Sequence, residues 1–243
     1  MEKGKTLKVN TIYPAFMGEV NTHGIGVPCT FLRLAGCNLR CYYKTKGTLC
    51  DTPEALEMKG GKDMSVSEIV YQVKCLGRKV VCLTGGEPLM QDVKELLTEL
   101  INNGYYVVIE TNGSKSIAPY RHIRNVSFVV DVKSASSGES ERMLEENYAL
   151  LNEKDFLKFV ADTKVDVIEF ERWVFSHNYL NCNVAIGTFW GSEISYGELI
   201  KELNRAAWNI PVYLNMQTHK MACLYDRYKD ENEFGELFIP RDL

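Results

Sequence analysis

The sequence has no long apolar run, and this absence excludes one large class of proteins. No window of its 243 residues approaches the roughly 18 apolar residues that a transmembrane helix needs. The first residues, MEKGKTLKVNTIYP, also lack the apolar stretch of a signal peptide. We therefore expect a cytoplasmic protein with no membrane partner.

The sequence also lacks an excess of positive charge. Lys and Arg number 28 and Asp and Glu number 32, so the formal net charge is −4 at pH 7. Proteins dedicated to nucleic acids are usually basic, so we expect no nucleic-acid partner. Repeats, low-complexity segments and linkers are absent as well, which favours a single domain over residues 1–243. Within it, the acidic residues 221–243 read as a C-terminal extension, on the surface or in a dimer contact.

Short apolar runs alternate with segments of helical periodicity along the chain. The expected strands are 29–36, 79–86, 105–113, 127–138 (with its loop), 155–162, 181–189 and 211–217, and the expected helices are 66–77, 92–104 and 196–209. This alternation predicts βαβ units and a parallel sheet, hence the α/β class. Such sheets bind ligands at the carboxyl ends of their strands, which is where the polar motifs of this chain fall.

Three of the eight cysteines, Cys37, Cys41 and Cys50, form the pattern C-x3-C-x8-C. In a reducing cytosol such clustering favours metal binding or catalysis over disulfides. A structural zinc site takes four ligands, often as two CxxC pairs. This chain has no second pair, and no histidine lies within ten residues of the three cysteines. Three thiolates fit a [4Fe–4S] cluster with one open iron, while a zinc site completed from afar and an inert cysteine-bearing loop stay open as alternatives.

The segment LTGGEP (83–88) follows a predicted strand. Paired glycines let a backbone approach a ligand closely, and the carboxylate of Glu87 can accept hydrogen bonds from an ammonium group. Together with the three-cysteine loop upstream, this motif resembles the radical S-adenosylmethionine (SAM) superfamily. The usual spacing there is C-x3-C-x2-C; here Lys44 stands at the third position and Cys50 follows a six-residue insertion. The resemblance implies an incomplete parallel (β/α) barrel of the radical SAM type, with SAM bound at a [4Fe–4S] cluster.

Several motifs in order resemble one family of that superfamily, the 7-carboxy-7-deazaguanine synthases. They are the opening segment 10–41, CDT (50–52), LTGGEPLMQ, VVIETNGS, DVKSASSG, DFLKFV and MQTHK. The resemblance implies conversion of 6-carboxy-5,6,7,8-tetrahydropterin to 7-carboxy-7-deazaguanine with loss of ammonia, on the route to queuosine and other deazapurines. It implies hydrogen abstraction at C6 and a Mg2+-assisted ring contraction. It also implies a reductant such as flavodoxin or ferredoxin, and a homodimer.

The same resemblance assigns individual residues. The cluster ligands would be Cys37, Cys41 and Cys50, and Thr52 would bind Mg2+ through its hydroxyl oxygen, a ligand type that magnesium prefers. SAM would contact Leu49, Cys50, Asp51, Gly85, Gly86, Glu87, Glu110, Asp131, Lys133 and Ser134. The substrate would contact Met17, Gly18, Glu19, Arg33, Thr84 and His219. Physically, the guanidinium of Arg33 suits a carboxylate, and Glu19 can accept from the guanidine-like edge of a pterin.

Two positions depart from the family pattern. Met17 stands where the family usually has glutamine, and GTFWGSEIS (187–195) lacks the usual proline-containing strand end. Two other functions stay open. An activating enzyme for a glycyl-radical protein would share the cluster and GGEP, but would act on a protein, and the Glu19–Arg33 pair and the CDT and QTHK motifs argue against it. A non-catalytic Fe–S or zinc module would leave GGEP, ETNG and DVKS unexplained.

Overall fold

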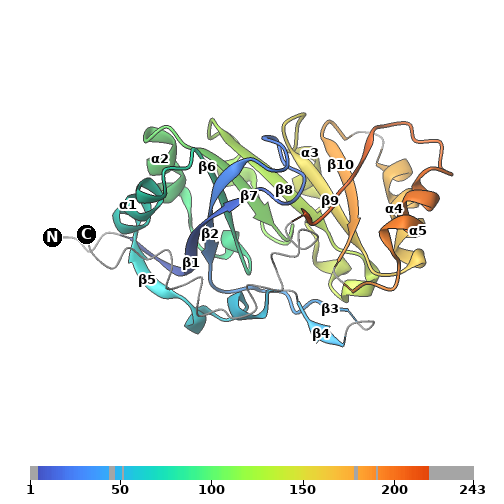
Figure 1. Ribbon diagram of the computed structural model, residues 1–243, viewed down its shortest axis with the longest axis horizontal. Helices are drawn as coiled ribbons and strands as arrows, with labels where there is room; N and C mark the ends of the chain where they lie inside the picture. Colours follow the sequence, from blue (N-terminus) through green and yellow to red (C-terminus); the bar gives the residue numbers. More distant parts are fainter. Residues whose placement is uncertain (1–4, 44–46, 51, 178–179, 190, 219–243) are drawn as a thin grey trace.

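The computed structural model describes residues 5–43, 47–50, 52–177, 180–189 and 191–218 (Figure 1). The strands are β1 (Thr6–Phe16), β2 (Pro28–Leu34), β3 (Tyr42–Tyr43), β4 (Thr48–Leu49), β5 (Lys62–Ser65), β6 (Val80–Gly85), β7 (Tyr106–Thr111), β8 (Val126–Val132), β9 (Phe156–Ala161), β10 (Asn183–Thr188) and β11 (Val212–Leu214). The α-helices are α1 (Val66–Leu76), α2 (Lys94–Asn102), α3 (Glu146–Ala149), α4 (Lys164–Ser176) and α5 (Tyr196–Leu203). Short 3-10 helices include η1 (Pro53–Ala55), η3 (Pro88–Met90) and η5 (Ala135–Ser137).

Nine of these strands form one sheet, in the order β11-β10-β9-β8-β7-β6-β2-β1-β5 across the described residues. The pairings from β2 through β6 to β11 are all parallel. Strand β1 runs antiparallel to β2, and β5 runs antiparallel to β1. The parallel α/β architecture expected from the sequence is therefore confirmed, with an antiparallel pair added at one edge.

The sheet curves into an incomplete barrel. Strands β1 and β11 lie near opposite ends of the sheet order, so a flat sheet with strands about 4.8 Å apart would separate them by roughly 30 Å. Yet Val20 N, after β1, donates to Asn215 Oδ1, after β11, at 2.9 Å. Likewise Thr218 N donates to Gly18 O at 3.0 Å. These contacts close the side of the barrel between the segment after β1 and the segment after β11, while β5 and β11 remain edges in the described part of the chain.

Successive side chains of each strand point alternately to the outside and to the inside of the barrel, as the two-residue period of a strand requires. Side chains such as Leu32, Leu83 and Ile109 point outward and form a buried core with the helices, which lie on the outside of the sheet in Figure 1. Their neighbours point inward. Among these, Cys82 and Val129 belong to a smaller apolar cluster, the floor of the barrel. Its buried members are Met17, Val20, Cys29, Val80, Cys82, Val108, Val129, Phe156 and Ala185.

The boundaries of the helices follow from local chemistry. Ser65 caps the start of helix α1 through a capping box with Glu68, and the helix ends before Gly77, whose φ of 67° suits glycine. Helix α5 ends at Leu203, well short of the expected residue 209. There the indole N–H of Trp208 donates to the Leu203 carbonyl at 2.8 Å, which satisfies an end group that a further turn would have used.

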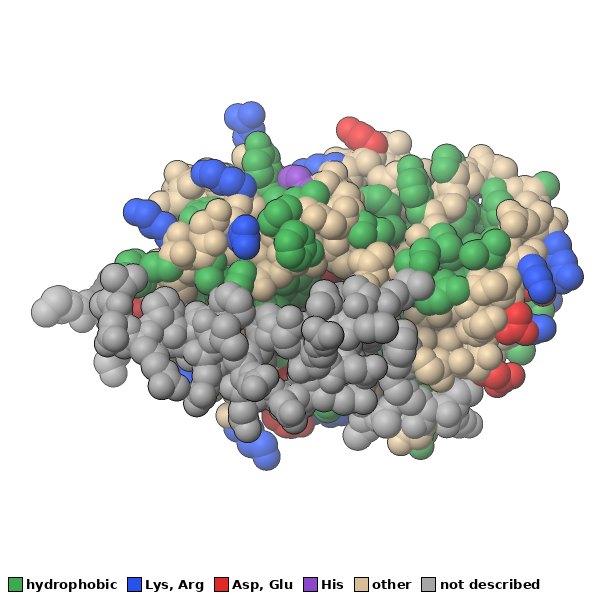
Figure 2. Space-filling model, in the orientation of Figure 1, with side chains coloured by type: hydrophobic (Ala, Val, Ile, Leu, Met, Phe, Trp, Pro, Cys, Tyr) green, Lys and Arg blue, Asp and Glu red, His purple; other side chains and the backbone are tan. Residues whose placement is uncertain are grey.

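The periodicity of the sequence did not predict β1, the β3–β4 hairpin, β5, α3 or α4. The division into a single domain stays a prediction, and the predicted C-terminal extension at 221–243 lies outside the described residues. No helix in the described part of the chain is long and apolar enough to span a bilayer. On the face shown in Figure 2, hydrophobic side chains (green) lie scattered among backbone and other side chains (tan). Lys and Arg lie at the upper left and at the right edge, where Asp and Glu also appear.

Candidate active site at the barrel mouth

A row of polar side chains lies on the inner face of the barrel, above the apolar floor. Each follows an inward floor residue by two or four positions on its strand, and the pairing register places Arg33 opposite Thr84 and Asp131 opposite Lys158. The row consists of Arg33 (β2), Thr84 (β6), Glu110 (β7), Asp131 and Lys133 (β8 and the residue after it) and Lys158 (β9). The structure thus gathers five of the predicted site residues at the carboxyl ends of neighbouring strands.

We call this row, together with Glu19 and the amides of Asn215 and Gln217 that donate to it, the barrel wall. Four charges of the barrel wall form a continuous chain of ion pairs. Lys133 Nζ lies 2.6 Å from Asp131 Oδ2, and Lys158 Nζ lies 3.2 Å from Asp131 Oδ1. Lys158 Nζ then reaches Glu19 Oε2 at 2.8 Å. Burial alone would lower the pKa of both lysines, but the neighbouring carboxylates outweigh it and raise both well above the usual value. The chain links the predicted SAM residues Asp131 and Lys133 to the predicted substrate residue Glu19.

Glu19 is held in place from three sides. Besides Lys158, the amides Asn215 Nδ2 and Gln217 Nε2 donate to its carboxylate at 2.9 and 3.0 Å. Burial alone would raise the pKa of Glu19, but the Lys158 charge and these hydrogen bonds outweigh it and lower the pKa from 4.5 to about 2. Glu19 is therefore ionised at neutral pH and retains acceptor capacity for N–H groups of a ligand.

Arg33 and Glu110 lie beside this network. Arg33 Nη1 pairs with Glu54 Oε1, from η1, at 2.7 Å. Its guanidinium can therefore hold a carboxylate at this position, and contact with a substrate carboxylate requires that Glu54 be shared or released. Burial raises the pKa of Glu110, and the positive charge of Lys158 acts in the opposite direction. The Glu110 side chain also forms a hydrogen bond with the thiol of Cys82.

The paired glycines of the GGEP turn approach the protein's own backbone. A Cβ built at Gly86 would lie 2.4 Å from Gly36 O and 2.5 Å from Ala55 O. At Gly85, where φ is 150°, it would lie 2.2 Å from Leu34 O. Any larger residue at Gly86 would displace the loop that carries the cysteines. The close approach indicated by the sequence therefore joins this turn to the cysteine loop, and the contact with SAM stays a prediction.

Glu87 has an internal role in this structure. Its side chain is fully buried, and its carboxylate accepts from Leu89 N at 2.9 Å, Asn112 N at 2.7 Å and Thr111 Oγ1 at 2.8 Å. Burial raises the pKa of Glu87 to about 7, against the lowering effect of these hydrogen bonds. The side chain ties the GGEP turn to the end of β7, and its predicted contact with the SAM ammonium stays untested.

The three predicted cluster ligands lie on one loop at the same mouth. All are partly buried, and none forms a disulfide within the described part of the chain. Cys50 N donates to Cys41 O at 3.0 Å, which places these two side by side at the base of the β3–β4 hairpin. Burial raises the pKa of the Cys37 and Cys41 thiols, while Lys133 acts in the opposite direction. Two reduced thiols fixed by the backbone, with Cys37 four residues before Cys41, fit the donor set of an Fe–S cluster.

Other observations bear on the implied cofactors. No three His, Cys, Asp or Glu side chains in the described part of the chain form a group that could hold a metal ion. An Fe–S cluster takes one thiolate per iron and so spaces its ligands more widely than a single ion does. Asn112 Nδ2 lies 3.6 Å from Cys37 Sγ, a hydrogen bond of the kind that tunes such clusters. Ser134 Oγ is buried and has no partner among the described residues, so a ligand hydroxyl or carboxylate could satisfy it.

The remaining predicted residues fall as follows. Thr52 precedes η1, and its side chain makes no capping hydrogen bond to that helix, so its hydroxyl is not engaged as an N-cap. Met17 is buried in the barrel floor, and the Gly18 carbonyl accepts from Thr218. Asp51 and His219 lie outside the described residues, and for Leu49 only the backbone position in β4 is described.

Sequence reasoning missed three residues of the wall, namely Lys158, Asn215 and Gln217. A lysine within the apolar run DFLKFV was a usable signal, since a buried lysine requires charged partners. The two amides carry no comparable signal, because Asn215 and Glu19 are 196 positions apart and meet only when the barrel closes. Gln217 brings an amide close to the segment where Met17 replaces the usual glutamine.

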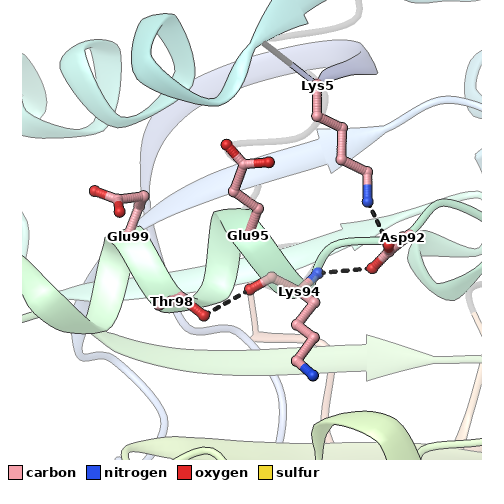
Figure 3. Close-up of a pocket in the computed structure, with 6 residues that line it drawn as sticks. All are labelled: Lys5, Asp92, Lys94, Glu95, Thr98 and Glu99. Carbon is pink, nitrogen blue, oxygen red and sulfur yellow. Dashed lines mark hydrogen bonds and ion pairs between the residues drawn. The ribbon is translucent and has the colours of Figure 1, made fainter.

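A surface groove along α2 is unrelated to this mouth (Figure 3). It is lined by Lys5, Asp92, Lys94, Glu95, Thr98 and Glu99. Lys5 pairs with Asp92, and the Lys94 backbone N–H donates to Asp92 Oδ1 at 3.1 Å. The groove is a solvated face with local ion pairs, and it contains none of the predicted site residues.

Known proteins resemble this chain in sequence and in fold. Residues 32–150 match the model of the radical SAM superfamily. The chain is 36% identical over 224 residues to 7-carboxy-7-deazaguanine synthase of Methanospirillum hungatei, covering 90% of this chain and 86% of the relative. It is 34% identical over 230 residues to that of Koribacter versatilis, covering 88% and 96%. The crystal structure of QueE from Escherichia coli shares the fold, with a TM-score of 0.66 at 19% identity over 87% of this chain and 93% of that chain.

Proposed function

The chain belongs to the 7-carboxy-7-deazaguanine synthase family of the radical SAM superfamily, and we propose that it converts 6-carboxy-5,6,7,8-tetrahydropterin to 7-carboxy-7-deazaguanine with loss of ammonia. One observation supports this function most directly. The anchored Glu19, joined through Lys158 and Asp131 to Lys133, faces the same barrel interior as Arg33, whose strand β2 runs on into the three-cysteine loop. A small molecule with an N–H edge and a carboxylate matches these two groups.

The cofactors fit the residues at this mouth. When bound, a [4Fe–4S] cluster and SAM supply the radical that removes hydrogen from the substrate. Cys37, Cys41 and Cys50 would hold the cluster. Lys133 and Ser134, whose buried hydroxyl has no hydrogen-bond partner among the described residues, would contact the nucleoside end of SAM.

The substrate would be oriented by groups that are already in place. Glu19 would accept from the aminopyrimidinone edge, and its contacts to Lys158 and the two amides keep it charged and aimed. Arg33 would bind the substrate carboxylate, with Thr84 beside it in the register. Groups fixed before binding need no reorganisation in the reaction, which is the main advantage of a rigid barrel wall.

Thr52 would contribute a hydroxyl oxygen to Mg2+, with substrate oxygens and water completing the shell. A flavodoxin or ferredoxin as the reductant, a homodimer and a cytoplasmic location are proposed from the family resemblance alone.

The test is anaerobic reconstitution of the full chain with iron and sulfide, followed by addition of reductant, SAM and the carboxypterin. We expect absorbance of the deazaguanine product from the wild type and none from Cys41→Ala. Glu19→Gln should retain the cluster and lose pterin affinity, whereas Glu95→Gln on the outer face of α2 serves as the matched control. Cleavage of SAM without any turnover of the pterin would contradict the proposed substrate and favour a protein substrate instead.

A further inference from the structure

Two features that depart from the family pattern meet in the structure. One is the insertion before Cys50, and the other is the unusual segment after β10. Tyr43, in the inserted hairpin, packs its ring against Phe189, the first residue after β10, with ring centroids 4.4 Å apart and planes at 39°. Phe189 is buried. The hairpin lies at the lower edge of the molecule in Figure 1.

The inserted hairpin carries two of the three predicted cluster ligands at its base. Tyr42 pairs with Leu49 and Tyr43 with Thr48. This pairing brings the Cys50 N–H to 3.0 Å from the Cys41 carbonyl. Cys50 itself has φ of 44°, in the left-handed region that residues other than glycine rarely adopt. Its placement therefore depends on the surrounding structure being held firmly.

Such a short hairpin is not stable without contacts to the rest of the protein. A two-stranded ribbon alone is marginally stable in water, and these strands have two residues each. The ribbon must pack on the barrel, and it does so at two places. β3 contacts η5, which follows β8, and the Tyr43 ring contacts Phe189 beyond β10.

We propose that the contact between Tyr43 and Phe189 is a positioning contact, which fixes the inserted hairpin on the end of β10 and thereby sets where Cys41 and Cys50 present their thiolates to the cluster. The inference rests on the proposed function only through the assignment of these cysteines as cluster ligands. It gives one role to both departures: the longer loop needs an anchor, and the aromatic residue after β10 supplies it.

The test measures how firmly the cluster is held. Wild type, Tyr43→Ala, Phe189→Ala and the double variant are reconstituted anaerobically as full chains. Iron and sulfide per chain are determined, and the release of iron to an excess of a ferrous chelator is followed by absorbance. Groups that support metal ligands typically matter by 10- to 100-fold, so we expect release from either single variant to be faster by about tenfold or more. Because the two rings act as a unit, the double variant should release iron no faster than the singles.

Two further variants separate positioning from general stability. Tyr43→Phe keeps the ring and should release iron at the wild-type rate. Phe175→Ala removes a different aromatic contact, because Phe175 of α4 stacks on Trp208 with ring centroids 5.9 Å apart. This variant should also release iron at the wild-type rate. The thermal unfolding of each apo chain is recorded, and Phe189→Leu replaces Phe189→Ala if the latter does not fold.

Wild-type release rates in Tyr43→Ala and Phe189→Ala would overturn the inference. So would equal acceleration by Phe175→Ala, or rates that multiply in the double variant. Failure of the premises gives different results. A wild type that takes up no cluster contradicts the cysteine assignment, whereas a wild type with a full cluster but no product contradicts the proposed function and leaves the release comparison valid.

Discussion

Replacing Lys158 with methionine removes the central charge of the barrel wall and keeps nearly the same side-chain length. Lys158 is 8% exposed and lies 2.8 Å from Glu19 Oε2 and 3.2 Å from Asp131 Oδ1. Without it, both carboxylates lose a cation in a poorly solvated site. Breaking a buried ion pair in this way typically costs about 3–5 kcal/mol of folding free energy.

The pKa of Glu19 gives a second route to this magnitude. It falls from 4.5 to about 2 in the folded chain, which corresponds to about 3 kcal/mol of stability, with contributions from Lys158 and the two amides. Since the folded pKa is the lower one, this stability is fully present above pH 4.5 and is lost as the pH falls toward 2. In Lys158→Met the pKa of Glu19 rises again because burial is no longer opposed by the ammonium.

The measurement is urea unfolding of the reduced apo chain between pH 7 and pH 3.5. We expect Lys158→Met to be less stable by about 3 kcal/mol at pH 7, and we expect the difference from wild type to shrink below pH 4.5. Lys8→Met is the matched control, since Lys8 pairs at 2.7 Å with the exposed Asp63, and an exposed pair contributes at most about 1 kcal/mol. A loss at pH 7 no larger than that of Lys8→Met, or a difference that stays constant down to pH 3.5, would refute the reasoning.

The remaining predictions concern the cysteine loop. Cys50→Ala should abolish iron uptake, whereas Cys75→Ala, on the exposed face of α1, should retain it; iron analysis after reconstitution decides. Thr52→Ala should keep the cluster but lose the magnesium stimulation of turnover, slowing it about tenfold, which is about 1.4 kcal/mol; parallel magnesium curves would defeat the assignment. Gly86→Ala forces a Cβ to 2.4 Å from a backbone oxygen and should destabilise by about 1–3 kcal/mol in urea unfolding. Gly197→Ala, with nothing closer than 4.0 Å, should change stability by less than about 1 kcal/mol.

Much of the barrel could be predicted from the sequence, because parallel strands that are buried on both faces appear as short runs of apolar residues. The parallel strands read as short apolar runs, and the polar residues that end them lie on the inner face. Helix α4 escaped notice because Val165 and Ile168 are exposed, which blurs the helical periodicity. Its start was still readable, since Thr163 and Asp166 form a capping box at the expected spacing.

The candidate site was predictable residue by residue and not as a network. Asp131 and Glu19 could each be proposed from their motifs, but the sequence does not indicate that one lysine joins them. That link depends on the register of β8 against β9 and on the closure that brings the segment after β1 against β9 and the segment after β11. Both are properties of the whole sheet, and a linear pattern carries no direct trace of them.

The composition of the inner wall is hard to explain by folding alone. Apolar residues fill the floor of the barrel, and continuing them to the mouth would stabilise the chain at least as well, because buried ion pairs often contribute no more than apolar residues of the same volume. The wall instead holds Lys133, Asp131, Lys158 and Glu19 in contact, so that each charge lies beside one of the opposite sign. Such a wall keeps its charges oriented when the site is empty, so a polar ligand that enters meets groups that need not rearrange. The cost in stability is thus consistent with selection for a fixed, charged binding surface at the mouth where the cysteine loop also lies.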